Sequence, residues 1–192
     1  MKYGEVTLGQ IEAIINKLGG MDYVRLLLSG KIRANFVIWK TIKLGTEQDH
    51  IRLYNDVVGW GHDFTQTAKD MMYHPDFTVE SKETEIDLVV ISGYDLGFSR
   101  RVRFNELCDR AISGGLDFCP SEVGPQVCHQ GGDLLLGHPE LIVAMKPITD
   151  GERIFFIRRR DRSSRIDGRS YSNEGAPMYP WEHLIFSLPR SK

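Results

Sequence analysis

The sequence predicts an α+β fold: a mixed or antiparallel sheet packed by helices, with a two-helix segment at the N-terminus. Two observations support this prediction. Apolar residues recur at helical spacing over 8–18 and 104–112, whereas short apolar runs of strand length occupy 85–92, 141–148 and 153–159. The order of elements after the N-terminal helices, β-α-α-β-α-β-β-β, fits helices packed on such a sheet.

Composition limits the class of protein. The chain has 192 residues, 41% hydrophobic and 26% charged, which suits one domain with a substantial core. A net charge of −2 gives no general attraction for nucleic acid, so that function would need a local patch. No apolar run is long enough to cross a bilayer, and residues 1–7 lack the features of a signal peptide. Three cysteines without a C-x-x-C pair indicate a reducing compartment, and we expect a cytoplasmic protein.

The N-terminal two-helix segment is predicted to span 1–33 and to precede a single α+β domain over 34–192. Thr7–Gln10 has the form of a capping box, Gly19–Gly20 is typical of a helix end, and Asp22 can begin a second short helix. A structural hairpin is favoured over a DNA-binding helix-turn-helix, because the second helix is short and the nearby basic residues are scattered. The apolar faces of these helices should pack on the main domain or on a protein partner.

The first half of the main domain should hold two strands and two helices. Alternating residues predict a strand over 36–43, which Gly45–Thr46 should end while capping the next helix. A further helix is expected over 63–73. The near-continuous apolar run 85–92 predicts a central, doubly covered strand. The acidic residues within Glu80–Asp87 indicate a solvated strand face, with a magnesium-dependent nuclease site as the weaker interpretation.

The second half should hold one helix and three strands. Helical spacing recurs over 104–112 and ends at a glycine pair. Strands over 141–148 and 153–159 should form a hairpin, because Asp-Gly lies within the intervening turn Thr149–Glu152. A last strand is expected over 183–188.

The segment Cys119–His129 gathers thiol, carboxylate, amide and imidazole groups. Its two prolines and glycine predict a restricted loop. In the functional interpretation, Glu122, Gln126 and His129 line a pocket, with Glu122 and His129 as acid/base candidates. In the structural interpretation, which we favour, the apolar residues fill the core and Glu122 binds local backbone groups.

A zinc site would have to draw on Cys119, Cys128, His129 and His138. Structural zinc ligands usually come in pairs two to four residues apart, whereas Cys128 and His129 are adjacent. Adjacent side chains rarely point at one ion. The sequence therefore predicts no metal site and no cofactor.

A second candidate site is basic. Six arginines fall within twelve residues of a slightly acidic chain: Arg158, Arg159, Arg160, Arg162, Arg165 and Arg169. Guanidinium groups suit phosphate, so nucleic acid or another anionic ligand can bind there. Tyr171, Tyr179 and Trp181 follow and can stack on bases. The alternative is a solvated loop whose arginines pair with Asp161, Asp167 and Glu174.

Six stretches of the chain form a distinctive combination: Thr7–Ala13, Asn16–Gly20, Glu83–Val90, Leu96–Phe98, Cys119–Gln126 and Met145–Asp150. Together they resemble uncharacterised small proteins of candidate-phyla bacteria, and they are spread over residues 7–150, which is most of the chain. The resemblance implies a recurrent small bacterial protein with a modular N-terminal segment. It implies no activity, ligand or catalytic residue.

The sequence contains no G-x-S-x-G, P-loop or Rossmann glycine motif. We therefore expect a non-catalytic binding or interaction protein that uses Cys119–His129 and the arginine cluster as its surface. The competing hypothesis is a small enzyme that acts on a nucleotide or nucleic acid, with the arginines holding phosphate.

Overall fold

The computed structural model describes residues 7–17, 20–28, 36–130, 137–148, 153–160, 163–170 and 177–189. The chain divides into two compact units, Met1–Phe36 and Val37–Lys192. The predicted boundary between residues 33 and 34 lies outside the described residues. No helix in the described part of the chain has both the length and the apolar character to cross a membrane.

The first unit contains α1 (Leu8–Lys17) and α2 (Met21–Leu28). At the start of α1, the Thr7 N–H donates to Gln10 Oε1 at 2.9 Å and the Gln10 N–H donates to Thr7 Oγ1 at 3.3 Å. These two bonds satisfy backbone donors that the helix itself leaves free. Gly20 then carries the chain out of α1 with a φ of 93°.

The second unit is built on a mixed sheet. Its seven described strands lie in the order β1-β3-β7-β4-β5-β6-β2. Their bounds are β1 (Lys40–Leu44), β2 (Asp63–Phe64), β3 (Thr84–Ser92), β4 (Glu140–Val143), β5 (Arg153–Arg159), β6 (Ser164–Ser170) and β7 (His183–Ser187). The pairs β4–β7 and β2–β6 are parallel, and the others are antiparallel. The expected α+β class with a mixed sheet is confirmed.

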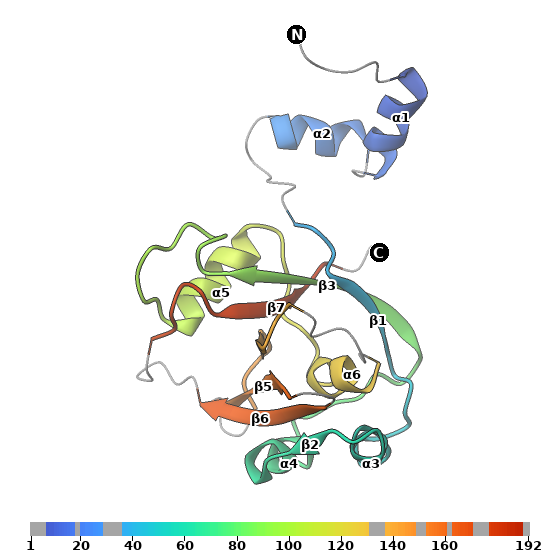
Figure 1. Ribbon diagram of the computed structural model, residues 1–192. Coiled ribbons are helices and arrows are strands. Elements are labelled where there is room, and N and C mark those ends of the chain that lie inside the picture. Colours follow the sequence, from blue (N-terminus) through green and yellow to red (C-terminus); the bar gives the residue numbers. More distant parts are fainter. Residues whose placement is uncertain are drawn as a thin grey trace. The chain divides into compact units, whose positions relative to one another are not determined.

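The helices of this unit are α3 (His50–Gly59), α4 (Gln66–Met72), α5 (Phe104–Ser113) and α6 (Val123–His129). Figure 1 shows α3 and α4 beside β2 and β6, and α5 beside β3 and β7. The core between helices and sheet is apolar, and Leu88, Phe155 and Phe186 are completely buried in it. Burial of such side chains contributes about 1.5–3 kcal/mol each.

Several strands follow the sequence pattern. β3 and β7 agree with the expected 85–92 and 183–188, and β4 and β5 form the expected antiparallel pair. In β3, Ile86 and Leu88 are buried while Glu85 is exposed, as the alternation predicts. However, β3 is the second strand from one edge rather than a central one. The turn Thr149–Glu152 lies outside the described residues.

Three expectations for the first half were wrong at the element boundaries. The strand expected over 36–43 begins only at Lys40, as β1. Residues 63–73 do not form one helix, because Asp63–Phe64 pair in parallel with β6 and Thr65 then caps α4, accepting from the Ala68 N–H at 3.2 Å. Long-range strand pairing here outweighs local helical preference. The helix α3 begins after Asp49 rather than after Gly45–Thr46, since the Asp49 carboxylate accepts from the Ile51 and Arg52 N–H groups.

The segment Cys119–His129 was predicted as a loop, but its second half is helix α6. Pro125 is tolerated because it lies in the first turn, where a backbone N–H has no partner within the helix. Gly124 is required by packing rather than by flexibility. A Cβ atom there would lie 3.0 Å from the Phe155 ring, so the glycine lets α6 approach β5 closely.

Candidate functional site: an aromatic pocket beside the arginine strands

A cavity of about 690 Å³ lies beside the central strands β4, β5 and β7. We call it the aromatic pocket. Its apolar lining includes Ile142, Phe156, Tyr179 and Trp181, and its polar lining includes Glu140, Glu182 and His183. A volume of this size suits a small ligand.

Strand register builds one side of the pocket. Glu140 of β4 lies opposite Arg158 of β5, and Ile142 lies opposite Phe156. Residues opposite one another in antiparallel strands share a face, so one apolar pair and one charged pair line the same surface. Arg158 Nε donates to Glu140 Oε1 at 2.7 Å, which holds this guanidinium group at the pocket rim.

A second arginine covers the pocket's phenylalanine. Arg169 of β6 pairs with Ile154 and therefore lies on the same face as Phe156. Its guanidinium carbon is 3.8 Å from the Phe156 ring centroid, within the range of a cation–π contact. The same guanidinium group is 3.5 Å from Glu182 Oε1, so Arg169 joins β6 to the segment before β7.

Tyr179 and Trp181 form an aromatic stack, with ring centroids 4.3 Å apart and planes inclined by 26°. The guanidinium carbon of exposed Arg101 lies 3.9 Å from the Tyr179 centroid. One ring face holds only one planar group at such distances, so Arg101 and Trp181 cover opposite faces of Tyr179. Trp181 ends the stack and is 54% exposed, which leaves ring surface available to a ligand.

The turn that carries Trp181 is fixed by backbone contacts. The Tyr179 N–H donates to Glu182 Oε2 at 2.7 Å, and the Glu182 N–H donates to the Tyr179 carbonyl at 3.1 Å. The Pro180 carbonyl accepts from the Tyr94 N–H at 3.0 Å. A Cβ atom on Gly93 would lie 2.9 Å from the Pro180 Cα, so glycine is needed for this approach. The exposed tryptophan is therefore held on a rigid support.

Burial shifts two titratable groups at this end of the sheet. Burial raises the pKa of Glu182, while the nearby Arg169 charge opposes that rise. Burial also lowers the pKa of His138, and the neighbouring His183, whose ring centroid lies 5.0 Å away, lowers it further. Burial is the main cause of both shifts.

The structure brings together only part of the predicted arginine site. Trp181 lines the pocket and Arg158 lies at its rim. Arg159 follows Arg158 along β5 and therefore points to the opposite face of the sheet. Arg160 lies 3.6 Å from Asp63, beside β2, and Arg162 lies outside the described residues.

The alternative prediction of a solvated loop was wrong on the loop, because residues 158–159 end β5 and 164–169 lie in β6, although Arg158, Arg159 and Arg160 are exposed. These strands pair through backbone hydrogen bonds, which do not depend on the side chains. The run of charged residues therefore gave no strand pattern in the sequence. Arginines of the segment do pair with carboxylates, but with Glu140, Asp63 and Glu182. Of the partners expected, Asp161 and Glu174 lie outside the described residues.

Glu122 and Gln126 are both completely buried and do not line the aromatic pocket. The Glu122 carboxylate accepts from the Gly45 N–H at 3.1 Å and from the Glu80 N–H at 2.9 Å. Gln126 donates to Thr46 Oγ1 at 2.9 Å and accepts from Gln130 at 2.7 Å. These contacts favour the structural interpretation of the segment.

His129 was the third residue in the functional interpretation of that segment. It lies at the end of α6, and its ring makes a T-shaped contact with the ring of Trp60. The three cysteines are buried, and burial raises the pKa of each thiol, for Cys128 to about 12. A thiol needs a depressed pKa to act as a nucleophile near neutral pH. The cysteines therefore serve the core.

Sequence reasoning missed most contributors to the pocket, among them Arg101, Phe156, Glu182 and His183. Phe156 and His183 look like ordinary strand residues, and only the strand order brings them together. Arg101 precedes Tyr179 by a long stretch of chain, and no local spacing links the two. An aromatic residue beside a proline, as in Tyr179-Pro180-Trp181, was the one local signal for an ordered turn.

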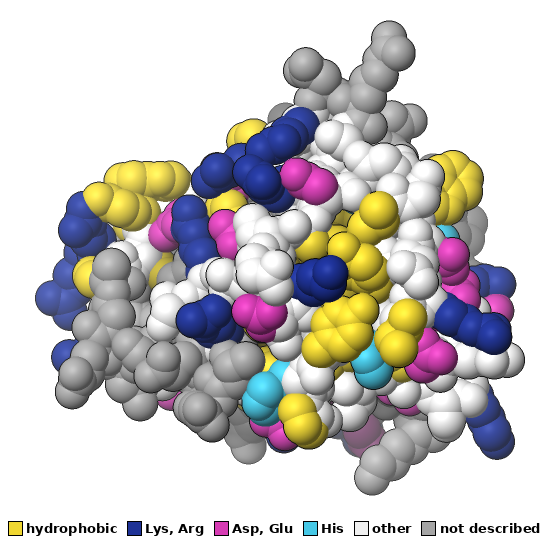
Figure 2. Space-filling view, turned by 90° about the horizontal axis from the view of Figure 1, so that it is seen from below, with side chains coloured by type: hydrophobic (Ala, Val, Ile, Leu, Met, Phe, Trp, Pro, Cys, Tyr) yellow, Lys and Arg dark blue, Asp and Glu magenta, His cyan; other side chains and the backbone are white. Residues whose placement is uncertain are grey.

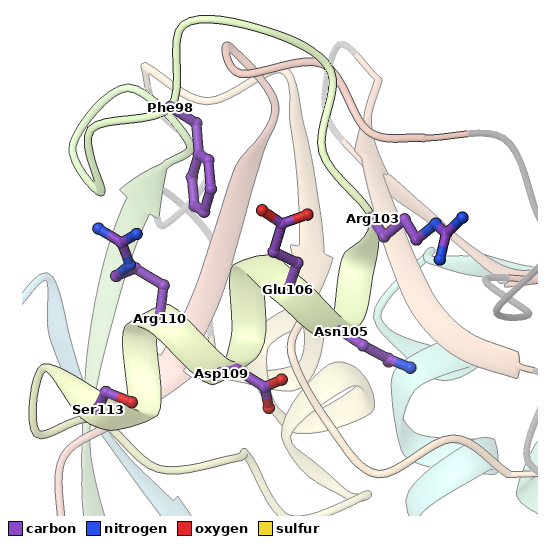
Figure 3. Close-up of a pocket in the computed structure, with 7 residues that line it drawn as sticks. All are labelled: Phe98, Arg103, Asn105, Glu106, Asp109, Arg110 and Ser113. Atoms are coloured by element: carbon purple, nitrogen blue, oxygen red, sulfur yellow. The ribbon is translucent and has the colours of Figure 1, made fainter.

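A different cavity of about 450 Å³ lies along α5 and the loop before it. Figure 3 shows that its side chains do not converge: Glu106 points toward the loop, whereas Asn105 and Asp109 point away from it. Phe98 is instead covered by Arg110, 5.4 Å from its ring centroid. This surface therefore offers weaker grounds for a site than the aromatic pocket does.

Comparisons of the chain with protein-family models, with curated proteins and with solved structures found no match.

Proposed function

We propose that this chain is a non-catalytic binding protein whose aromatic pocket holds one nucleotide unit, free or within a single strand. The observation that carries the proposal is Trp181, an exposed ring on a rigid turn at the end of the Arg101–Tyr179–Trp181 stack. A planar base can extend this stack into the pocket. Stacking of one base on an aromatic side chain contributes about 1–3 kcal/mol.

The charges at the pocket support an anionic group on that ligand. Arg101 lies at one end of the stack, and Arg158 and Arg169 border Phe156. Guanidinium groups bind phosphate oxygens in a forked geometry. The carboxylates of Glu140 and Glu182 already hold Arg158 and Arg169 in place, so little side-chain entropy remains to be lost on binding.

A small enzyme with Glu122 and His129 as its acid/base pair has less support. Such an enzyme needs both groups to reach a substrate, and Glu122 is sealed in the core by two backbone N–H donors. The aromatic pocket is lined by other residues. The binding proposal therefore accounts for more of the geometry.

The proposal is tested by titrating the protein with AMP and UMP in a calorimeter, and with labelled short oligo-A and oligo-U strands by fluorescence anisotropy. We expect Trp181→Ala to weaken binding roughly tenfold or more, because the stacking surface is lost. Trp181→Phe should retain part of the affinity. Tighter binding of strands than of mononucleotides would identify single-stranded nucleic acid as the ligand.

Neighbouring arginines provide matched controls. Arg158→Ala should weaken binding, whereas Arg159→Ala, on the opposite face of the same strand, should not. Likewise Arg101→Ala should reduce affinity and Arg100→Ala should not. Each phosphate contact removed should also lower the salt dependence by about one unit in the log–log slope. The proposal would be contradicted if the two variants of each pair changed the affinity equally. It would also be contradicted if the affinity did not depend on salt concentration.

We also propose a cytoplasmic, bacterial setting of the candidate-phyla type and a protein partner for the N-terminal two-helix segment. The free, buried cysteines support a reducing compartment. In α1, the exposed side chains of Leu8, Ile11 and Ile14 support a protein-binding role. Cross-linking in a bacterial host tests for this partner by comparing the parent protein with the double variant Ile11→Ser, Ile14→Ser. The same cross-links in both proteins would contradict the proposed partner.

A further inference from the structure

A second group of polar side chains lies on α3 and α6, and it shares no residue with the aromatic pocket. Among the described residues, Glu47, Asp56 and His129 each offer a ligand atom, and these atoms lie within 4.8 Å of one another. All three side chains are half-buried. Figure 2 views the end of the unit where α3, α4 and β2 lie and shows histidines there among acidic and hydrophobic side chains.

The fold explains how residues so far apart in sequence meet. Glu47 precedes α3, Asp56 lies within α3 and His129 ends α6, and these two helices pack on each other. The Gln130 amide that follows His129 bonds to the Lys43 backbone, with its Oε1 accepting from the Lys43 N–H at 2.8 Å. The end of α6 is thereby attached to β1, and His129 is held over α3.

The imidazole of His129 has an unused nitrogen. Its Nδ1 atom is buried and has no hydrogen-bond partner within the described structure. The ring is oriented instead by Trp60, whose centroid lies 6.4 Å away at an angle of 84°. A buried nitrogen without a partner costs about 1–3 kcal/mol, and a ligand bound there would remove that cost.

The two carboxyl groups are crowded against one another. Their ligand oxygen atoms lie within 4.8 Å of each other and of a ligand atom of His129. A cation placed among these atoms could be bound by both carboxylates at once. Two carboxylates balance the charge of one divalent ion.

We propose that Glu47, Asp56 and His129 bind one divalent transition-metal ion of the zinc class, as a site separate from the aromatic pocket. Ligands around zinc lie about 2.0–2.2 Å from the metal, so a tetrahedral set has ligand atoms about 3.4 Å apart. The observed group needs only a modest contraction to reach that spacing. Three protein ligands leave one position for water or for another ligand.

The nature of the donors selects the metal. One imidazole nitrogen with two carboxylate oxygens suits Zn²⁺ or Co²⁺, whereas Mg²⁺ and Ca²⁺ prefer oxygen ligands alone. The nearby His62 is not proposed as a ligand, because its Nδ1 accepts from the Ser164 N–H at 2.9 Å. Its other nitrogen then carries the proton and can only donate.

The test uses the full chain freed of metal with a chelator and then titrated with Zn²⁺ and Co²⁺, each followed by calorimetry. We expect one equivalent of metal and a higher Tm, since binding stabilises the native state. His129→Gln, Glu47→Gln and Asp56→Asn should each weaken binding by at least about 10- to 100-fold. Glu106→Gln, an exposed carboxylate on α5, is the matched control and should bind as the parent does.

Spectroscopy locates the ion independently of stability. Bound Co²⁺ should quench the fluorescence of Trp60, and Trp60→Phe should abolish that quenching while the calorimetric binding persists. Visible Co²⁺ bands without a thiolate charge-transfer band should accompany binding, because the cysteines are buried. A thiolate band, affinity equal in parent and His129→Gln proteins, or no binding to the parent would each overturn the proposal.

Discussion

At the scale of single residues, Glu122 is a buried carboxylate that links separate parts of the backbone. Its carboxylate accepts from backbone N–H groups of two segments, one following β1 and one preceding β3. It also lies 3.4 Å from the Gln126 amide on the next turn. A buried carboxylate is tolerated when its oxygens are bonded in this way.

Replacing Glu122 with Ala should lower the free energy of unfolding by about 2–5 kcal/mol. Two buried N–H groups would lose their acceptor, and each unsatisfied donor costs about 1–3 kcal/mol. Glu122→Gln should cost less because one acceptor oxygen remains. Urea denaturation measures both changes, with Glu106→Gln as the exposed control. A loss under about 1 kcal/mol for Glu122→Ala would contradict the structural role.

His138 should make the fold sensitive to mild acid. Its pKa is lowered in the native state, first by burial and then by His183. In the unfolded chain His138 is protonated near pH 6.5, whereas in the native chain it stays neutral at that pH. The free energy of unfolding therefore falls as pH drops through this value. The pKa of half-buried His62 is also lowered, mainly by burial, and acts in the same direction.

Thermal unfolding between pH 8 and pH 5 checks this prediction. His138→Gln should flatten the pH dependence of Tm in comparison with the parent protein. The flattening should be partial, because His62 continues to contribute. Parallel curves for the two proteins would show that His138 titrates alike in both states.

At the scale of elements, the turn Tyr179–Glu182 depends on a contact from outside its own strand. Pro180 of this turn is buried and packs on Gly93, which follows β3. Gly93→Ala should displace the turn, lower stability by about 1–3 kcal/mol and weaken ligand binding at Trp181. Gly59→Ala is the control, since a Cβ there meets nothing within 4 Å. Calorimetry and ligand titration measure the two effects.

Elements with regular apolar patterns could be predicted, and those shaped by distant partners could not. The run 85–92 predicts β3 directly, because its near-continuous apolar residues have strand length and most of them are buried. β2 has two residues and exists only through its pairing with β6. Helix α6 could not be predicted because Gly124 and Pro125 are typical of turns. In the structure, Gly124 allows close packing on Phe155, and Pro125 lies in the first turn, where proline is tolerated.

The same distinction applies to the candidate sites. Trp181 could be named from the sequence because aromatic and basic residues cluster near it. Arg101 could not, since its position over Tyr179 depends on a contact made across the fold. The group of Glu47, Asp56 and His129 likewise has no ligand spacing along the chain and becomes visible only where α3 meets α6.

At the scale of the whole molecule, protection against hydrogen exchange should differ strongly between elements. The helices α1 and α2 have ten and eight residues, and helices this short are marginal without tertiary packing. The strands β3, β7 and β4 are flanked by neighbours on both sides. Exchange followed by mass spectrometry should therefore show rapid labelling of 8–28 and slow labelling of 84–92 and 183–187.

The reverse pattern, or slow exchange throughout 8–28, would contradict this expectation and indicate that α1 and α2 are stabilised by further contacts. Comparison with and without added nucleotide provides a control. Ligand in the aromatic pocket should slow exchange near 179–183 and leave 8–28 unchanged.

The sequestered thiols have a practical consequence for every experiment of this kind. Because Cys108, Cys119 and Cys128 are all enclosed by the fold, maleimide reagents should leave the native protein unmodified. One cysteine introduced at an outward-facing position, such as Ser113, would then be the single point of attachment for a dye or spin label. Distances from the label to other parts of the protein could then be measured without first replacing the three native cysteines.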